Sequence, residues 1–256
     1  MLLKLIVCII AGLGAGVGTG LAGLSAAAVI SPMLITFLGF PAYEAVGISL
    51  ASDVLASAVS AYTYGKHKNL DIKNGLVMLL AVLVFTLVGS WAASRMTNTA
   101  MGGFSVLMTL LLGIKFIVRP VMTTKETQEH KTLRQKVVQS ILCGILVGFI
   151  CGFVGAGGGM MMLLVLTSVL GYELKTAVGT SVFIMTFTAF TGAASHMAIG
   201  GAPDLSALIL CVIATLAGAR GSALFANKAE PRTLNRITGV VLAALGAAML
   251  IVKFLT

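Results

Sequence analysis

The feature that most constrains this chain is a repeat, because its second half follows its first at one constant offset. Identical residues recur 132 positions apart without any gap. An offset of this kind indicates a duplicated structural unit, so we expect two copies of one helix arrangement. The matches are Gly12 with Gly144, Gly16 with Gly148, Gly20 with Gly152, Gly23 with Gly155, Gly39 with Gly171, Ala45-Val46-Gly47 with Ala177-Val178-Gly179, Ser49 with Ser181, and Gly89-Ser90 with Gly221-Ser222.

Long apolar stretches indicate that these repeats lie in a membrane. Of the 256 residues, 58% are hydrophobic and only 10% are charged, and the mean hydropathy is +1.06. These values lie far outside the range of soluble globular domains and predict an all-α polytopic membrane protein. The apolar stretches cover residues 2–40, 45–64, 74–94, 100–118, 137–170, 177–199, 205–226 and 234–255.

Two of these stretches, 2–40 and 137–170, are too long for a single crossing, which needs about 20 residues. Both contain a glycine-rich segment, and each glycine costs a helix about 1 kcal/mol relative to alanine. We therefore predict a helix break near 20–25 and another near 152–159, which gives ten helical segments, five in each repeat. The pieces beside each break can either cross the membrane or return as re-entrant hairpins.

The basic residues predict how the two repeats are oriented. Three basic loops can all face the cytoplasm if each half crosses the membrane an odd number of times, which places both termini outside. Loop 66–73 then lies inside and its equivalent, 198–205, lies outside, so the repeats have inverted topology. The basic loops are 66–73, 119–136 and 228–236, and the cations left outside are Lys4, Arg95 and Lys253. The domains are an N-terminal repeat (1–118), a cytoplasmic linker (119–136) and a C-terminal repeat (137–256).

Glycines occur in two patterns that predict different roles. Those at every fourth position, such as Gly12, Gly16 and Gly20, share one helix face and allow close helix packing. The run from Gly155 to Gly159 contains more glycine than packing requires. Backbone N–H groups freed at a break inside a membrane need a partner, and such groups bind anions well. We therefore interpret the run as an anion-binding turn.

Two ionisable residues within the apolar stretches need an explanation. Asp53 lies in the middle of a predicted span, where a carboxylate is costly and is a functional candidate by default. Proton coupling and a structural hydrogen bond to nearby hydroxyls are the two alternatives, and its equivalent in the other repeat is Met185. His196, the equivalent of Tyr64, lies near the end of a span, and we interpret it as an interfacial anchor.

Several classes of function are disfavoured. The sequence has no basic cluster interleaved with aromatic residues, so we expect no nucleic-acid partner. It has no His-Glu-x-x-His or Gly-x-Ser-x-Gly motif and only one carboxylate deep in a span, so we do not expect an enzyme. No cofactor or metal is expected, because no Cys-x-x-Cys spacing occurs among Cys8, Cys143, Cys151 and Cys211.

The glycine-rich break, followed by a short helix and then Ala177-Val178-Gly179-Thr180-Ser181, resembles the sulfite exporter TauE/SafE family. The likeness extends over essentially the whole chain. The first half departs from the pattern, with Gly23-Leu24-Ser25-Ala26-Ala27 in place of the glycine triplet and Ile48 in place of the threonine. The resemblance implies a multi-pass transporter in the bacterial cytoplasmic membrane. Its substrates would be small, mainly sulfur-containing anions such as sulfite, thiosulfate or organosulfonates.

These observations together predict a secondary transporter that works by alternating access, with an anion channel as the alternative and a non-transporting scaffold as a third reading. The expected partners are a small anion and the lipid bilayer, and a homo-oligomer is compatible with the sequence. Asp53 is the candidate for proton coupling. The residues expected at the anion site are Gly23, Ser25, Gly47, Ser49, Gly155, Gly157, Gly158, Gly159, Gly179, Thr180 and Ser181.

Overall fold

The computed structural model describes residues 2–97, 133–154 and 158–230, together with a few single positions elsewhere. Every regular element in these ranges is a helix. The predicted fifth segment of each repeat and nearly all of the linker lie outside the described residues. The first half contains α1 (Leu2–Ala22), the 3-10 turn η1 (Ala26–Ala28), α2 (Ile30–Leu38), α3 (Ala42–Lys66) and α4 (Ile72–Ala93). The second half contains α6 (Leu133–Val154), α7 (Gly158–Leu164), the π-helical turn η3 (Val165–Val169), α8 (Leu174–Gly200) and α9 (Leu205–Lys228).

Five of the described helices are long and apolar enough to cross a membrane: α1, α3, most of α4, α8 and α9. Large apolar side chains such as Leu80, Phe190 and Ile213 are more than half exposed on these helices, as expected of surfaces that face lipid. The prediction of an all-helical, multi-pass membrane protein is confirmed for the described residues.

The helix boundaries follow the 132-residue offset. Helices α6, α8 and α9 each begin within one residue of the position that the offset assigns from α1, α3 and α4. Both predicted breaks are present, since α1 ends at Ala22 and α6 ends at Val154. The short pieces also end alike, because Gly39 and Gly171 are equivalent and adopt left-handed backbone conformations with φ of 67° and 74°. Only glycine adopts this conformation without strain.

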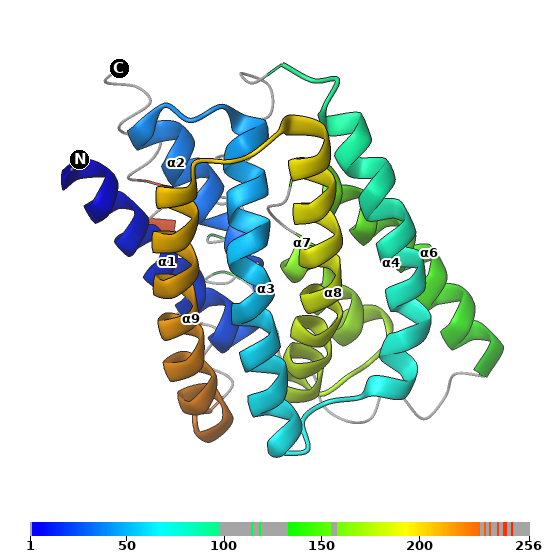
Figure 1. Cartoon of the computed structure of the whole chain (residues 1–256). Coiled ribbons are helices and arrows are strands. Elements are labelled where there is room, and N and C mark those ends of the chain that lie inside the picture. The colour runs from blue at the N-terminus through cyan, green and yellow to red at the C-terminus, as the bar shows by residue number, and fades with distance from the viewer. Residues whose placement is uncertain are drawn as a thin grey trace.

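The two halves are interlocked in space. Helix α1 packs on α9, α4 packs on α6, and α3 packs on α8 in the middle of the bundle (Figure 1). In Figure 1 the connection between α3 and α4 lies at the lower end of the view, and the connection between α8 and α9 lies at the upper end. Each half therefore contributes the packing partner for a helix of the other half.

The glycines at every fourth position pack helices, as predicted. A Cβ atom on Gly12 would lie 2.6 Å from the Cβ of Ala214 in α9, and one on Gly144 would lie 2.9 Å from the Cβ of Ala81 in α4. Equivalent serines reinforce both contacts. The Ser222 hydroxyl donates to the Gly16 carbonyl oxygen at 3.1 Å. The Ser90 hydroxyl donates to the Gly152 carbonyl oxygen at 3.3 Å.

Two of the cations that the predicted topology leaves outside have local partners. The Lys4 ammonium group donates to the Asp204 carboxylate at 2.6 Å. The Arg95 guanidinium lies 5.3 Å from the centre of the Trp91 ring. Pairing and stacking of this kind reduce the cost of holding a cation there. The third, Lys253, is outside the described residues.

Candidate functional site

The two helix breaks meet in the interior of the bundle. Gly23 ends α1 in a left-handed conformation (φ 63°), and its N–H donates to the Thr19 carbonyl oxygen at 2.9 Å. A Cβ atom on Gly159, at the start of α7, would lie 2.6 Å from the Gly23 carbonyl oxygen and 2.6 Å from the Ser25 nitrogen. Three of the predicted site residues, Gly23, Ser25 and Gly159, are therefore in contact.

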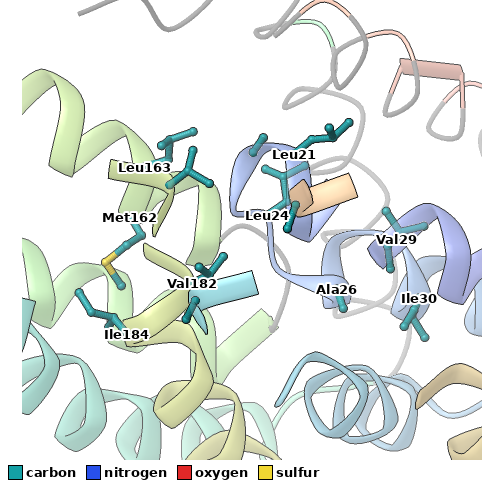
Figure 2. Packing of buried hydrophobic residues seen from close by; sticks show 14 of the residues in the cluster. Leu21, Leu24, Ala26, Val29, Ile30, Met162, Leu163, Val182 and Ile184 are labelled. Carbon is teal, nitrogen blue, oxygen red and sulfur yellow. The ribbon is translucent and has the colours of Figure 1, made fainter. Parts of the chain in front are cut away.

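Apolar side chains from both halves surround this meeting point. Leu21, Leu24 and Ala26 from the first break belong to the same buried cluster as Met162, Leu163 and Val182 from α7 and α8 (Figure 2). Polar groups here are thus screened from lipid and bulk water, which strengthens any electrostatic interaction between them.

Ser181 also reaches the meeting point. Its hydroxyl is fully buried and donates to the Val178 carbonyl oxygen at 2.8 Å, and a Cβ atom on Gly23 would collide with this hydroxyl. Ser25 accepts the N–H of Ala27 at 3.3 Å and so caps η1. Both hydroxyl groups retain hydrogen-bonding capacity beyond these local bonds.

Asp53, fully buried in α3, faces the first break. Ser57 donates to Oδ1 at 2.8 Å, while Oδ2 has no hydrogen-bond partner among the described residues. The hydroxyl groups of Thr19 and Ser25 and the N–H of Ala26 are close enough to interact electrostatically with the carboxylate. A buried, incompletely bonded carboxylate is costly to maintain in its charged form.

Met185, the equivalent of Asp53, lies at the second break. Its sulfur would be 2.6 Å from a Cβ atom on Gly159. Helices α3 and α8 thus present a carboxylate to one break and a neutral thioether to the other. Among the described residues at the meeting point, the only carboxyl group comes from the first half.

Gly158 begins α7, and a Cβ atom there would lie 2.8 Å from the Cβ of Cys151. Gly158 is not among the glycines with a positive φ, the conformation that would make glycine necessary there. Gly155 and Gly157 lie outside the described residues.

The remaining predicted site residues lie away from the meeting point or bond locally. Gly47 faces His196, with 3.3 Å between a Cβ on the glycine and that of the histidine. Gly179, its equivalent, faces Tyr64 in the same way at 2.9 Å. The Ser49 hydroxyl donates to the Ala45 carbonyl oxygen in its own helix at 2.5 Å.

Residues 69–71, between α3 and α4, close one end of the α3–α8 pair. A Cβ atom on Gly179 would collide with the Asn69 carbonyl oxygen. The N–H of Asp71 donates to the Thr180 hydroxyl at 3.1 Å, and the Tyr172 hydroxyl donates to the Asp71 carboxylate at 3.0 Å. The Thr180 side chain is therefore bonded to this loop, whereas the hydroxyl of the next residue, Ser181, lies at the break.

The opposite end of the pair is open. A cavity of about 180 Å³ lies between the start of α3 and the end of α8, and Tyr43, Glu44, Gly47, His196 and residues 200–203 line it. Residues 201–203 are the equivalents of 69–71. The same structural position is thus packed at one end of the protein and hollow at the other.

The interpretation of His196 as an interfacial anchor is wrong, because the side chain is only 2% exposed. Its Nε2 lies 3.1 Å from the Gly152 carbonyl oxygen, and its ring stacks on Tyr43 with centroids 4.1 Å apart. The Tyr64 hydroxyl likewise donates to the Gly20 carbonyl oxygen at 3.0 Å. The repeat offset relates Tyr64 to His196 and Gly20 to Gly152. This offset is therefore the sequence signal that links the two contacts.

Comparison with known proteins gives a consistent result. The family model described as sulfite exporter TauE/SafE matches residues 8–249. The "Probable membrane transporter protein YunE" of Bacillus subtilis is 27% identical over an alignment of 268 positions. The alignment covers 97% of this chain and 98% of that protein. A protein of Methanocaldococcus jannaschii, also named a probable membrane transporter, is 24% identical over 265 residues, covering 98% of this chain and 97% of its own. No solved structure matches the chain. Because the family model covers nearly all of it, the chain belongs to the sulfite exporter TauE/SafE family, a family of membrane transporters.

Proposed function

We propose that this protein is a secondary transporter that moves a small sulfur-containing anion, such as sulfite, thiosulfate or an organosulfonate, across the bacterial cytoplasmic membrane. Membership of the TauE/SafE family and full-length similarity to proteins named as probable membrane transporters support transport as the activity. The chemistry of the site supports an anion as the substrate.

In this proposal the halves are inverted repeats that rock against each other. The matching helix boundaries, the interlocked helix pairs and the opposite placement of the two equivalent connections in Figure 1 support this architecture. Inverted repeats allow alternating access, because exchanging the conformations of the two halves converts an outward-facing state into an inward-facing one.

The observation that carries the proposal is the difference between the two ends of the α3–α8 pair. Gly179 is packed against the Asn69 carbonyl oxygen, whereas its equivalent, Gly47, borders a cavity of about 180 Å³. Identical repeats in identical conformations would give two packed ends or two hollow ends. One of each is the arrangement expected of a carrier that is open on one side.

We place the anion where the two breaks meet. Ser25 and Ser181 supply hydroxyl groups, and the start of α7, at Gly158 and Gly159, supplies N–H groups. Groups of this kind stabilise an oxyanion in a site that excludes water. Gly155 and Gly157 complete the proposed site from outside the described residues.

Asp53 is the proposed proton-coupling residue of this transporter. It contacts Ser57 and faces Ser25, so a carboxylate and an anion at the break would repel each other across one hydroxyl group. Protonation of the carboxyl group removes that repulsion. Binding of anion and proton would then favour each other, which is the requirement for coupled movement.

A thermal-shift screen of the purified protein tests the proposed substrate class. Sulfite, thiosulfate, sulfate, sulfonates and carboxylates are compared, since a ligand present at 100 times its dissociation constant adds about 2.7 kcal/mol to stability. The site variant is Ser181→Ala and the matched control is Ser52→Ala. Both serines are fully buried and donate to their own helix, at 2.8 and 2.9 Å.

The proposal expects the anion-induced shift to decrease strongly in Ser181→Ala and to persist in Ser52→Ala. An equal anion-induced shift in both variants would show that the anion does not bind at the meeting point of the breaks. Counterflow in proteoliposomes separates a carrier from a channel, because only a carrier shows saturable stimulation of uptake by anion on the opposite side.

A further inference from the structure

His196 contacts two backbone carbonyl groups at once. Its Nε2 lies 3.1 Å from the oxygen of Gly152, in the last turn of α6, and its Nδ1 lies 3.2 Å from the oxygen of Tyr43, in the first turn of α3. The side chain, carried by α8, therefore links three helices. It also links the second helix break to the rim of the cavity.

The protonation state of the ring decides how many of these contacts are hydrogen bonds. A carbonyl oxygen only accepts, and neutral imidazole carries a single N–H group. The neutral ring can therefore bond either Gly152 or Tyr43, and its second nitrogen then presents a lone pair to the other oxygen. Imidazolium carries two N–H groups and satisfies both.

The equivalent residue in the first half makes a contact that cannot change in this way. Tyr64 uses its single hydroxyl group to bond the Gly20 carbonyl oxygen at 3.0 Å, with the Leu21 oxygen at 3.5 Å. Gly20 and Gly152 are repeat equivalents, as are Tyr64 and His196. One half thus has a fixed contact at its break and the other half has one that depends on a proton.

The cavity allows protons to reach His196, and the groups around it come from α3, α4 and α6. From α3 it faces the stacked ring of Tyr43 and the carboxylate of Glu44 across the cavity. Glu44 accepts the N–H of Asp204 at 2.9 Å, which bonds it to the N-terminal end of α9. From α6, Cys151 adjoins the bonded Gly152. From α4, the Ser90 hydroxyl also donates to the Gly152 oxygen at 3.3 Å, and the Ser90 carbonyl oxygen accepts from the Tyr43 hydroxyl at 3.4 Å.

We propose that His196 is a proton-binding site at the base of the cavity and that its proton locks the second helix break to α3. When the proton is bound, both carbonyl groups are held and the end of α6 is fixed. When it leaves, one hydrogen bond is lost and with it the link from this end of α6 to α3, while the Ser90 hydroxyl still donates to the Gly152 oxygen. The inference goes beyond anion transport, and its test requires no substrate.

The first measurement asks whether His196 titrates. The chain has three histidines, so His67→Gln together with His130→Gln leaves His196 as the sole one. Nitrogen-15 NMR of the labelled full chain in nanodiscs then follows its two ring nitrogens from pH 5 to 8. We expect both to be protonated at the acidic end and one to lose its proton within this range. A ring that stays in one state throughout overturns the proposal.

The second measurement asks whether the proton controls the break. Cys151, only 3% exposed and next to Gly152, is the reporter, and Cys8→Ala, Cys143→Ala and Cys211→Ala make it the sole thiol. Its rate of alkylation by a maleimide is measured against pH and divided by the rate in a matched protein with His196→Tyr. The division cancels the ordinary ionisation of the thiol, and tyrosine reproduces the contact of the first half.

We expect this ratio to rise about fivefold with pH, the factor that corresponds to losing one hydrogen bond worth about 1 kcal/mol. Tyr64→Phe should keep the pH profile, because it removes the fixed contact of the other half. If His196→Tyr fails to fold, His196→Gln takes its place as the reference. A ratio that is flat across the titration overturns the proposal even where NMR shows that His196 binds a proton.

Discussion

Gly159 lies directly against Gly23: a Cβ atom on Gly159 would be 2.6 Å from the carbonyl oxygen of Gly23. The two halves touch here through backbone, so the added methyl group of Gly159→Ala must push the breaks apart. We expect the free energy of unfolding to fall by about 1–3 kcal/mol, the usual cost of overpacking. Thermal melting of the purified protein measures this loss.

The matched control is Gly221→Ala in α9, where an added Cβ would meet none of the described residues within 4 Å. Alanine favours a helix over glycine by up to about 1 kcal/mol, so melting should be unchanged or slightly higher. Equal losses in Gly159→Ala and Gly221→Ala would show that the contact between the breaks does not contribute to stability.

The inverted arrangement predicts the sides on which two connections lie. Single cysteines replace Lys66 and Ala202, both exposed, in a chain whose native cysteines are removed. The first should react with an impermeant thiol reagent only from the cytoplasm, and the second only from outside. Labelling of both positions from the same side would contradict inverted repeats.

Asp53→Asn should abolish the dependence of transport on a pH gradient while anion binding persists. Asparagine keeps an oxygen that can accept the hydrogen bond of Ser57, seen at 2.8 Å, but it cannot gain or lose a proton. Uptake into proteoliposomes with and without an imposed gradient provides the measurement. Ser57→Ala is the control, since it removes the hydrogen bond to Asp53 and leaves the carboxyl group in place. An unchanged response of Asp53→Asn to the pH gradient would assign Asp53 a structural role.

The contact between Lys4 and Asp204 predicts a pH-dependent contribution to stability. The hydrogen bond from Lys4, aided by those from Ser206 and the Ala207 N–H, holds the pKa of the Asp204 carboxyl well below its usual range. A carboxyl with a depressed folded-state pKa stabilises the protein above its unfolded pKa of about 3.9, and this contribution is lost as the pH falls below that value.

Lys4→Met should therefore lower stability at pH 7 by about 0.2–1 kcal/mol, the range for exposed ion pairs. The difference from the parent protein should shrink as the pH is lowered below about 4. Melting curves at a series of pH values measure it. The control Asp204→Asn retains an acceptor for the Ala207 N–H, bonded at 3.0 Å, and loses only the charge. A difference independent of pH would mean that Lys4 acts through packing.

Much of the helical framework could be predicted from the sequence. Glycine spacing predicted the packing faces of α1 and α6, and the hydropathy pattern predicted both helix breaks. These features follow from local composition and from the constant offset. The partners of the helices could not be predicted in this way, because the contacts of Gly12 with Ala214 and of Gly144 with Ala81 depend on how the halves cross in space.

The candidate site was less accessible to sequence reasoning. The motif 177–181 suggested one anion-binding unit, yet the structure turns Gly179 and Thr180 toward Asn69 and Asp71 and leaves Ser181 at the break. Side chains one residue apart on a helix point in directions that differ by about 100°, so neighbours in a motif need not share a target. The burial of His196 was missed because a polar residue near a span end suggested an interface.

The pairing of α1 with α9 has a consequence for how the protein is made. Ribosomes add about 5–20 residues per second, so on the order of 10 to 40 seconds separate the synthesis of α1 from that of its partner. Helix α6, in contrast, finds α4 already inserted when it emerges. Helix α1 therefore waits for its main packing partner much longer than α6 does. Until α9 is made, the glycine face of α1 lacks this partner. It is then free to bind a protein that assists membrane insertion, or to pack on a non-native helix.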